Sequence, residues 1–355
     1  MDQMHNTEME KKKQDFLEKL KIEQDMVIKV MNIPQGTPEW LQWRLCRMTA
    51  SNYGAVAGHN PYKSPKQLLG DLLWNTFKGN NATKWGSEHE SDAAKIYEKF
   101  ISGYHEKEGT MEFFYPGLII SQNQPWLAVS PDGLPALQKY NKTTDTNSLL
   151  LRFLLEIKCP FSKKLYPHIP HYYFDQIQGI MGILNLPFCD FVVWTPEKSQ
   201  VRRYNFDSSY WVQVLFPKLR KFFMDEYLPR LILKEEGQLL EGEIDPVMQI
   251  NIDSIRQPIE VEQTESITFT ITSPQPTESI IQEPEQTILS SIQLAKEPEP
   301  TIPSSEKNQN NLLNLLDSDV TIINESESVR KQDQNKDTQK LKKPKRTTKR
   351  KTVTD

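Results

Sequence analysis

The sequence predicts an α/β (α+β) fold, in which helices flank a central mixed β-sheet, followed by a low-complexity, disordered C-terminal tail. Apolar and aromatic residues concentrate between Ile33 and Leu233. Within that range helical periodicity alternates with strand-like runs in the order helix, strands, helix, strands, helix. Residues 234–355 are rich in Pro, Glu, Ser, Thr and Gln, a composition that buries too little apolar surface to fold.

The predicted parts are a charged N-terminal helix over 1–33, a folded domain over 34–233 and the tail over 234–355, which ends in a basic run. Residues 7–31 show helical periodicity, with a narrow apolar stripe that includes Phe16 and Leu20. Pro34 and the residues that follow it break this helix.

The cysteines and the N-terminus indicate a soluble, intracellular protein. Cys46, Cys159 and Cys189 are scattered, without a CxxC pair, so we expect reduced thiols. The N-terminus lacks the apolar core of a signal peptide, and no apolar run approaches the roughly 20 residues of a membrane span. The formal net charge of -4 mixes a folded part with acidic and basic tail segments, and therefore excludes no class of partner.

A helix is predicted to begin at Pro38, because proline suits the first turn and Thr37 can cap it. Arg44 and Arg47 form an i, i+3 pair near its end. Ser51 can cap a following helix, whose amides and dipole favour an anion. Two interpretations follow: a phosphate site, or an ordinary amphipathic helix with solvated arginines.

Residues 85–100 predict a second helix, on which Glu90 shares the inward stripe with Ala93, Ala94 and Tyr97. A glutamate on a core-facing stripe needs a cation to offset the cost of its burial. The candidates are a buried ion pair with a lysine and an ion that approaches past the small neighbouring side chains.

Two strands are predicted over 111–121 and 125–130, and Pro131-Asp132-Gly133 ends the second. Residues 138–148 form a predicted polar loop before a long apolar strand, Leu149–Lys158. Because side chains alternate across a strand, Glu156 and Lys158 share one face and Ile157 points to the other. An acid and a base on an apolar strand are costly unless they pair, bind a metal or take part in chemistry.

The remaining predicted elements are a helix over His171–Leu184, two strands over 188–195 and 201–206, and a closing helix from about residue 208 to 229. Gln176 lies on a face of the first of these helices that adjoins its apolar stripe.

The carboxylates Glu90, Asp132 and Glu156 are expected to converge on one edge of the sheet. Three such groups would repel one another strongly unless a divalent cation lay among them. The residues therefore predict a magnesium site.

At this point the sequence resembles a known family. Pro131-Asp132 followed by Glu156-Ile157-Lys158 matches the PD-(D/E)xK nuclease motif. With the blocks WLQWRLCRMTAS, WGSEHE, SPDGL, LEIKCPF and DQIQG, the chain looks like the YqaJ-type viral recombinases, relatives of the bacteriophage lambda exonuclease. The resemblance covers about residues 36–232.

The resemblance implies a restriction-endonuclease-like core in which residues 34–233 form a PD-(D/E)xK nuclease domain. It further implies metal-dependent hydrolysis of duplex DNA from a 5′-phosphorylated end, in viral-type recombination or DNA processing. By that resemblance Mg²⁺, or Mn²⁺ as a substitute, is held by Glu90, Asp132, Glu156 and the backbone carbonyl of Ile157. Lys158 then orients or deprotonates the attacking water.

The family pattern also implies roles for three further residues. Gln176 matches the glutamine that supports the lysine and the substrate phosphate, Arg44 matches the arginine that grips the 5′ phosphate, and Ser51 matches its helper. The implied partners are double-stranded DNA ends, a single-strand-annealing or other recombination protein, and further copies of the chain, with no membrane. The alternatives are an endonuclease of the same superfamily and a nuclease-derived, non-catalytic DNA-binding or scaffold protein.

The run KLKKPKRTTKRK at residues 340–351 is typical of a nuclear-import signal or a DNA or RNA tether, although basic tails also serve solubility alone. The nucleus, a viral replication site and the virion are the locations left open by this tail.

Overall fold

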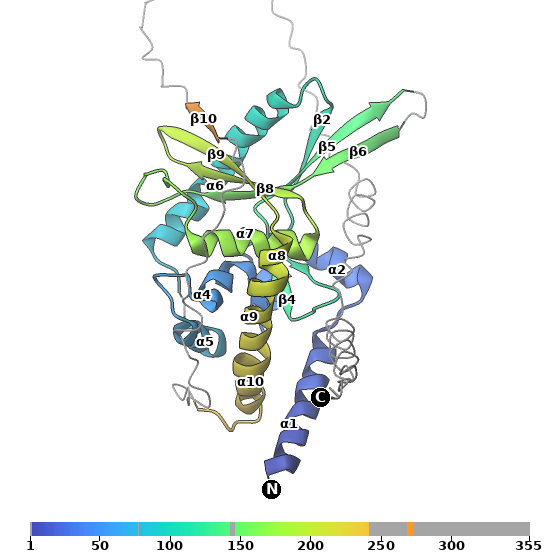
Figure 1. Cartoon of the computed structure of the whole chain (residues 1–355), viewed down its shortest axis with the longest axis vertical. Helices are drawn as coiled ribbons and strands as arrows, with labels where there is room; N and C mark the ends of the chain where they lie inside the picture. The colour runs from blue at the N-terminus through green and yellow to red at the C-terminus, as the bar shows by residue number, and fades with distance from the viewer. Residues whose placement is uncertain (1, 77, 143–145, 241–267, 273–355) are drawn as a thin grey trace, which may run out of the picture. The chain divides into compact units, whose positions relative to one another are not determined.

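A mixed sheet with strand order β10-β9-β8-β7 forms the centre of the computed structural model, which describes residues 2–76, 78–142, 146–240 and 268–272 (Figure 1). Its strands are β7 (Leu154–Lys158), β8 (Phe188–Trp194), β9 (Lys198–Asn205) and β10 (Thr268–Thr272). Strands β7 and β8 are parallel and are connected through helix α7 (His171–Leu184), whereas the other pairs are antiparallel. The carboxyl ends of β7 and β8 therefore lie at the same edge of the sheet.

Two smaller three-stranded sheets accompany the central one within the described residues. One consists of β2 (Thr110–Phe114), β5 (Leu134–Asn141) and β6 (Thr146–Arg152), and the other of β1 (Met48–Thr49), β3 (Ile119–Ile120) and β4 (Leu127–Val129). Figure 1 shows the β5–β6 hairpin projecting away from the central sheet.

The hairpin corrects two predictions. The segment 138–148, predicted as a polar loop, mostly forms paired strands, and the predicted strand Leu149–Lys158 is divided at Phe153 between β6 and β7. Most of β6 is exposed on both faces, so the segment lacks the polar-apolar alternation that marks a half-buried strand. The tie between the two sheets is a bridge in which Leu155 N donates to Gly133 O at 2.9 Å.

The N-terminal region contains two helices, α1 (Asp2–Leu20) and α2 (Gln24–Met31), rather than the single predicted one, because residues 21–23 interrupt it. The apolar stripe is nevertheless buried, including Phe16 and Leu20. Helix α3 (Pro38–Arg44) begins where predicted, and the Thr37 hydroxyl accepts a hydrogen bond from Trp40 N at 3.2 Å.

The other helical elements near the site are η1 (Ala50–Asn52), α4 (Tyr53–Ala57), α5 (Pro65–Trp74) and α6 (Asn81–Tyr104). The closing helix runs continuously through α8 (Ser208–Tyr210), η2 (Trp211–Leu215), α9 (Phe216–Lys221), η3 (Phe222–Tyr227) and α10 (Leu228–Glu235). Both η2 and η3 are π-helical turns, and each directly precedes a segment with proline in its first turn. Proline lacks the N–H that an unbroken α-helix requires, and the wider turns accommodate that loss.

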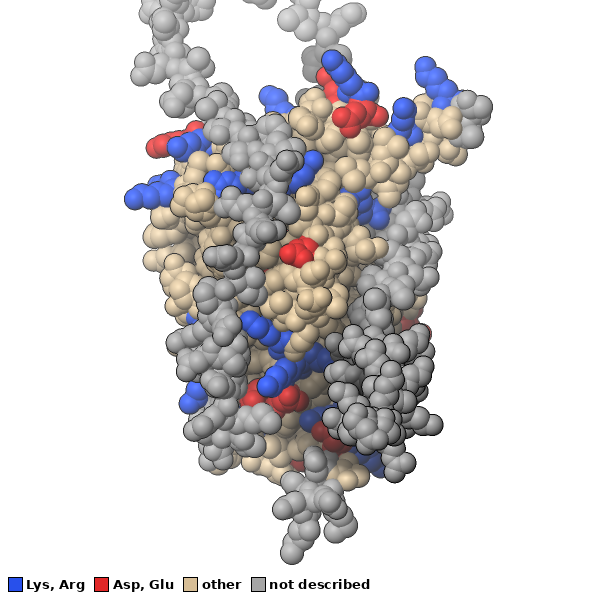
Figure 2. Space-filling model, viewed as in Figure 1, with Lys and Arg blue, Asp and Glu red and all other residues tan. Residues whose placement is uncertain are grey.

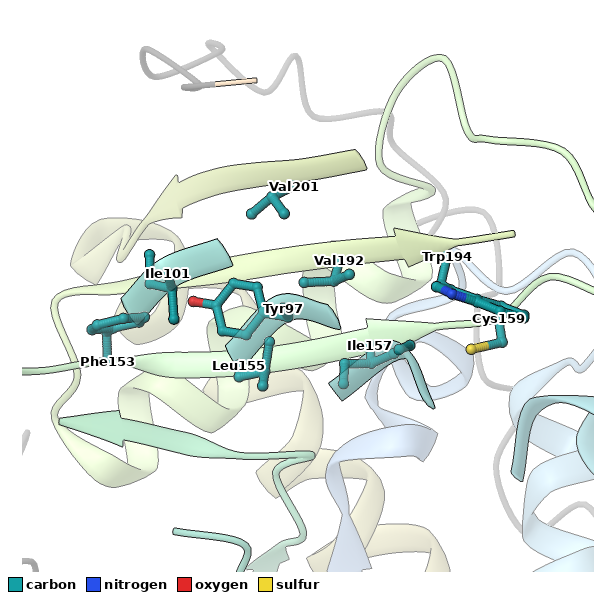
Figure 3. Close-up of a cluster of buried hydrophobic side chains, with 10 residues drawn as sticks. Tyr97, Ile101, Phe153, Leu155, Ile157, Cys159, Val192, Trp194 and Val201 are labelled. Atoms are coloured by element: carbon teal, nitrogen blue, oxygen red, sulfur yellow. The ribbon is translucent and has the colours of Figure 1, made fainter. Parts of the chain in front are cut away.

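Helix α6 packs across one face of β7 and β8 and forms a buried apolar cluster there (Figure 3). Leu155, Ile157 and Cys159 belong to this cluster, on the face opposite Glu156 and Lys158 as the alternation of a strand requires, so Cys159 is a packing residue. Burying one such side chain contributes about 1.5–3 kcal/mol. This packing fixes α6, and with it Glu90, over the strand that carries Glu156 and Lys158.

The mixed sheet with flanking helices confirms the predicted fold class. In the range 234–355, predicted to lack regular structure, the described residues include the end of α10 and strand β10, whose backbone pairs with β9. The TFTIT sequence of β10 alternates Thr with apolar residues, as strands often do. The basic run 340–351 lies outside the described residues. In the described part of the chain, none of the helices has the length and apolarity that crossing a membrane requires.

Candidate active site

Glu156, Lys158 and Gln176 meet at the carboxyl end of β7. Both the Lys158 Nζ and the Gln176 Nε2 donate to Glu156 Oε1, each at 2.5 Å. The Glu156 side chain is fully buried, while that of Lys158 is 18% exposed. The strand therefore places acid and base on one face, and α7 supplies the amide that fixes the carboxylate.

The second oxygen of Glu156 has no partner. Among the described residues, Oε2 is buried without a hydrogen bond. An unsatisfied carboxylate oxygen is costly in a buried site, because it has lost the water that it would bind in the unfolded chain. The arrangement therefore leaves a buried carboxylate oxygen whose cost a cation could offset.

Asp132 joins this group through the backbone of β7. Its Oδ2 accepts a hydrogen bond from Ile157 N at 2.7 Å. The bridge between Gly133 and Leu155 holds the Pro131-Asp132 turn against the strand, so the two motif halves, 25 residues apart, become neighbours.

Glu90 reaches the same region from α6. It is half-buried and shares the lining of a pocket of about 630 Å³ with Asp132 and Ile157. The pocket is also lined by Gln35, Gly36, Trp40, Ser87, Ser91, Ala94, Lys95, Glu98 and Tyr115. The cavity therefore opens onto two of the three acids that the sequence predicts to converge.

The carboxylates hold their protons more tightly than isolated acids do. Burial, followed by the charge of Asp132, raises the pKa of Glu156 to about 8 and that of Glu90 to about 7. Burial also raises the pKa of Asp132, and the charge of Lys158 offsets only part of the effect at each acid. The site thus favours proton uptake or a further positive charge.

Lys158 is implied by the family resemblance to orient or deprotonate water, and deprotonation requires a lysine that can lose its proton. Burial acts in that direction, but Glu156 and Asp132 together raise the pKa of Lys158 above its ordinary value. Its ammonium also lies 4.9 Å from the centre of the Tyr173 ring. In this structure Lys158 is therefore a cation that pairs with Glu156.

The residues present fit a divalent cation. In the described part of the chain no three or more Asp, Glu, His and Cys side chains lie together as a group that could hold a metal ion, so Glu90, Asp132 and Glu156 do not form a complete ligand set by themselves. Mg²⁺ does not need one, because it retains several waters and binds through one or two carboxylates together with substrate phosphates. Asp132 and the Glu156 oxygen that has no hydrogen bond among the described residues are two such carboxylates, and Glu90 lines the same pocket as Asp132.

Arg44 forms a separate polar site at the end of α3. Its Nη2 donates to Thr49 Oγ1 at 3.1 Å and lies 3.5 Å from Ser51 Oγ, and its guanidinium carbon is 4.2 Å from the centre of the Trp40 ring. Burial lowers the pKa of Arg44 to about 10. No carboxylate among the described residues pairs with this guanidinium, so its charge remains available to an anion.

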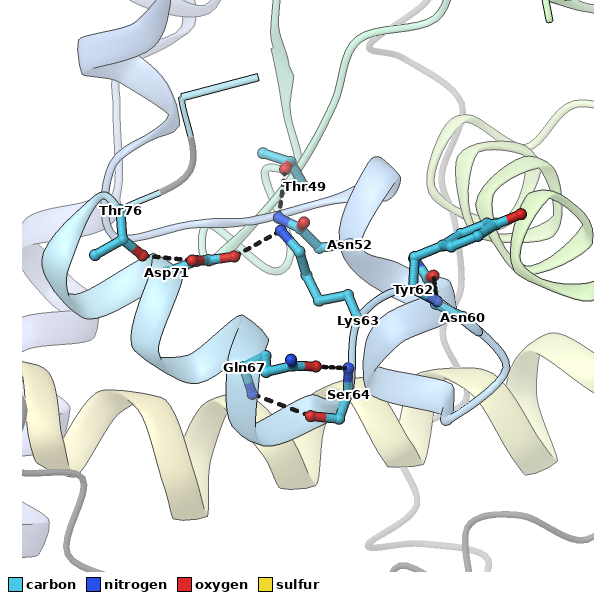
Figure 4. A network of polar contacts seen from close by, with 9 residues as sticks. All are labelled: Thr49, Asn52, Asn60, Tyr62, Lys63, Ser64, Gln67, Asp71 and Thr76. Carbon is cyan, nitrogen blue, oxygen red and sulfur yellow. Dashed lines mark hydrogen bonds and ion pairs between the residues drawn. The ribbon is translucent and has the colours of Figure 1, made fainter. Parts of the chain in front are cut away.

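Arg47, in contrast, is structural, which corrects the expectation of a paired arginine fork. Its guanidinium donates to three backbone carbonyls, those of Leu20, Trp43 and Pro125, at 2.9 to 3.1 Å. Ser51 does not cap a helix, because it lies within η1, and neither η1 nor α4 has a side-chain cap. The Thr49 hydroxyl accepts hydrogen bonds from Arg44 and from Asn52, the second of which is drawn in Figure 4.

Sequence reasoning missed the parts played by Trp40, Thr49 and Tyr173 around these charges. A signal existed for Trp40, because it precedes Arg44 by four residues and so lies one helical turn away. No local pattern links Tyr173 to Lys158, which lies on a different element.

Together, the fold and the site define a class of protein: a mixed-sheet domain with clustered carboxylates and a lysine at the carboxyl end of a central strand. Residues 39–186 match the model of the YqaJ-like viral recombinase domain. The family resemblance inferred from the sequence is confirmed over that range.

Viral proteins and one bacterial enzyme structure are similar to the chain. An uncharacterised protein of Acanthamoeba polyphaga mimivirus is 28% identical over 179 residues, covering 47% of this chain and 30% of the relative. A protein of African swine fever virus (strain Badajoz 1971 Vero-adapted) is 30% identical over 169 residues, covering 42% of this chain and 46% of the relative. The matches thus span less than half of either relative. The alkaline exonuclease LHK-Exo from Laribacter hongkongensis has 22% sequence identity and a TM-score of 0.40, covering 57% of this chain and 99% of that chain.

Proposed function

We propose that this protein is a metal-dependent DNA exonuclease that digests duplex DNA from a 5′-phosphorylated end. The observation that carries the proposal is the buried Glu156 carboxylate, which holds Lys158 and Gln176 on one oxygen and leaves the other without a partner beside Asp132. The match to a viral recombinase domain supports DNA as the substrate and recombination or DNA processing as the setting.

Each side chain has a role that follows from its contacts. When bound, a divalent cation polarises a phosphoryl oxygen and lowers the pKa of water. Asp132, Glu156 and Glu90 would hold it, with the carbonyl of Ile157 as a further oxygen ligand. Gln176 fixes the orientation of the Glu156 carboxylate, and Lys158 presents its ammonium where negative charge accumulates on the phosphate.

The Arg44 site would bind the terminal 5′ phosphate. A guanidinium forms paired hydrogen bonds to phosphate oxygens, and the Thr49 and Ser51 hydroxyls beside it hold its orientation. Ser51 is exposed and can itself donate to the phosphate. Fixing the end of the strand would set the distance to the scissile bond and so convert binding into orientation.

Figure 2 shows no continuous basic stripe among the described residues of the face it presents, because Lys and Arg side chains are scattered there among Asp and Glu. We infer that end recognition depends on Arg44 rather than on a continuous basic stripe along this face.

The test is digestion of linear duplex with and without a 5′ phosphate, and of closed circular duplex, in Mg²⁺, Mn²⁺ or EDTA. We expect loss of nucleotides from linear DNA only, dependent on metal and faster with the phosphate. Asp132→Asn and Lys158→Met should abolish release, and Arg44→Met should remove the preference for the phosphate. Lys84→Met, a lysine that is 77% exposed on α6, is the matched control and should digest normally.

Two results would redirect the assignment. Cleavage of closed circles by the wild type would indicate an endonuclease of the same superfamily. Metal-dependent binding without cleavage, or release that is unaffected in both Asp132→Asn and Lys158→Met, would overturn the proposed site.

A further inference from the structure

A row of tyrosine rings leads from the protein surface to Lys158. Tyr62, which is 81% exposed, lies with its ring centre 6.2 Å from that of Tyr172, in an edge-on arrangement. Tyr172 is 4.2 Å from Tyr173, whose ring contacts the Lys158 ammonium at 4.9 Å. Tyr166, from the loop after β7, packs on Tyr173 at 5.9 Å. These four residues are called the tyrosine row below.

The row is held in place at its outer end. Tyr62 N donates to Asn60 Oδ1 at 2.8 Å, and the backbone N–H groups of His59 and Asn60 donate to Gly54 O at 2.9 and 3.0 Å. His59 Nδ1 lies 2.9 Å from a carboxylate oxygen of Asp175, a fully buried residue of α7. The loop that carries Tyr62 is therefore fastened to the helix that carries Tyr172 and Tyr173.

The same loop connects the row to the Arg44 site. In Figure 4, Tyr62 and Lys63 extend from it in opposite directions, Lys63 toward Asp71, Asn52 and Thr49. Lys63 Nζ is 2.6 Å from Asp71, while Asn52 donates to Thr49, which also accepts from Arg44. A single fixed loop thus spans the region between the proposed phosphate anchor and the aromatic surface.

We propose that the tyrosine row is a stacking site for the unpaired bases of the DNA strand that is being digested, with Tyr62 as the outermost platform. The inference rests on the proposed function for its substrate. Every base has a π-face, so an aromatic row binds a strand regardless of sequence, while cations take its phosphates. Here Lys158 lies at the inner end of the row, and the Arg44 guanidinium, which donates to Thr49, lies beyond the loop.

The polar hydroxyls of the row and the burial of Asp175 favour a nucleic acid strand over an apolar partner. Its rings are neutral and carry hydroxyls, and Asp175 beneath the loop is buried against His59 and Tyr210, so it offers no exposed negative charge. A strand lying on the row would bring its phosphates toward the Lys158 ammonium at its inner end.

The experiment measures binding separately from cleavage. The full chain is titrated into a 3′-fluorescein-labelled, 5′-phosphorylated single-stranded oligonucleotide in Ca²⁺ with no Mg²⁺, and anisotropy is followed. We expect Tyr62→Ala to weaken binding about five- to tenfold, because one base–aromatic stack is lost. Tyr62→Phe keeps the ring and should bind like the wild type. Tyr140→Ala, which removes a tyrosine that is 54% exposed on β5, is the matched control and should also bind normally.

A second arm tests the base directly. Oligonucleotides with a single abasic site at successive positions from the 5′ end are bound to wild type and to Tyr62→Ala. At one position the abasic site should weaken wild-type binding by the same factor as the substitution, and the two changes together should be no worse than either alone.

Three results would overturn the stacking role. Tyr62→Ala could bind as tightly as the wild type, or Tyr62→Phe could lose as much affinity as Tyr62→Ala. The losses from Tyr62→Ala and from the abasic site could also be additive at every position. Failure of the wild type to bind the strand would overturn the stacking role, whereas the proposed function is decided by the digestion of duplex DNA. Tyr62-dependent binding without cleavage in any metal would refute the exonuclease and leave the stacking site standing.

Discussion

Metal affinity should depend steeply on pH, because the carboxylates proposed to hold the cation carry raised pKa values. Glu90 has a pKa of about 7 and Glu156 of about 8, so both must lose a proton before they can act as ligands. Protons therefore compete with Mg²⁺ for these carboxylates. Between pH 6 and pH 9 this competition weakens about tenfold for Glu90 and about a hundredfold for Glu156. The dissociation constant for Mg²⁺ should therefore fall by about a thousandfold over that range.

The raised pKa values also predict how thermal stability changes with pH, in EDTA and in saturating Mg²⁺. A raised acid pKa means that the folded chain holds protons that the unfolded chain releases, so this stabilisation is complete below the ordinary pKa and is lost as pH rises through 7 to 8. In EDTA the melting temperature should fall across this interval. Saturating Mg²⁺ binds the ionised folded form alone, so its stabilising effect should grow with pH.

The assays are isothermal titration calorimetry in buffers of different ionisation enthalpy, which counts released protons, and thermal unfolding from pH 5 to 9 with and without Mg²⁺. Glu90→Gln should reduce the pH dependence to about a hundredfold, the part assigned to Glu156. Ser87→Ala, a change at another residue lining the same pocket, should leave the pH dependence intact. A constant Mg²⁺ effect across this pH range would refute the reasoning.

Two further substitutions test the packing that positions the site. Gly179→Ala on α7 would drive its methyl group into the buried Tyr53 ring and should lower the free energy of unfolding by about 1–3 kcal/mol in urea. Gly103→Ala on α6, which has open space around it, is the control and should not. Equal effects of the two substitutions would contradict the close contact. Tyr97→Phe removes a hydroxyl that donates to the buried Asp190 at 2.8 Å, and should cost about 1–2 kcal/mol by the same assay without changing metal affinity.

Helix α7 and the Glu156–Lys158 pair could be predicted from the sequence because local patterns determine them. The apolar stripe of α7 has a clear helical period, and Pro170 lies directly before its first residue. The alternation of a strand is enough to place Glu156 and Lys158 on one face, and the hydrogen bond between them agrees.

The β5–β6 hairpin could not be predicted because its strands lack that pattern. Thr146 to Leu150 are all exposed, so apolar and polar residues occur there without a buried face to sort them. The run from Leu149 to Leu155 is apolar except for Arg152, and nothing in such a run marks Phe153 as the point where the chain changes sheets.

Arg44 and Arg47 show why the roles of two similar residues can differ. They share helical spacing and neighbouring tryptophans, so the sequence assigned both to one anion site. The carbonyls that occupy Arg47 belong to Leu20, Trp43 and Pro125, and two of these residues are distant in the chain. Only the tertiary fold separates the structural arginine from the one whose charge is available.

Lys158 illustrates how a neighbouring charge can decide the chemistry available to one side chain. Burial by itself lowers the pKa of this lysine, and the attraction of Glu156 and Asp132 more than reverses that effect. If those carboxylates share their charge with a cation, the attraction weakens and the effect of burial remains. Lys158 would then release its proton more easily with the site loaded than without it. Under the proposed function, Lys158 would then become a neutral amine able to accept a proton only once a cation offsets the charge of the carboxylates, which would couple water activation to correct assembly of the site.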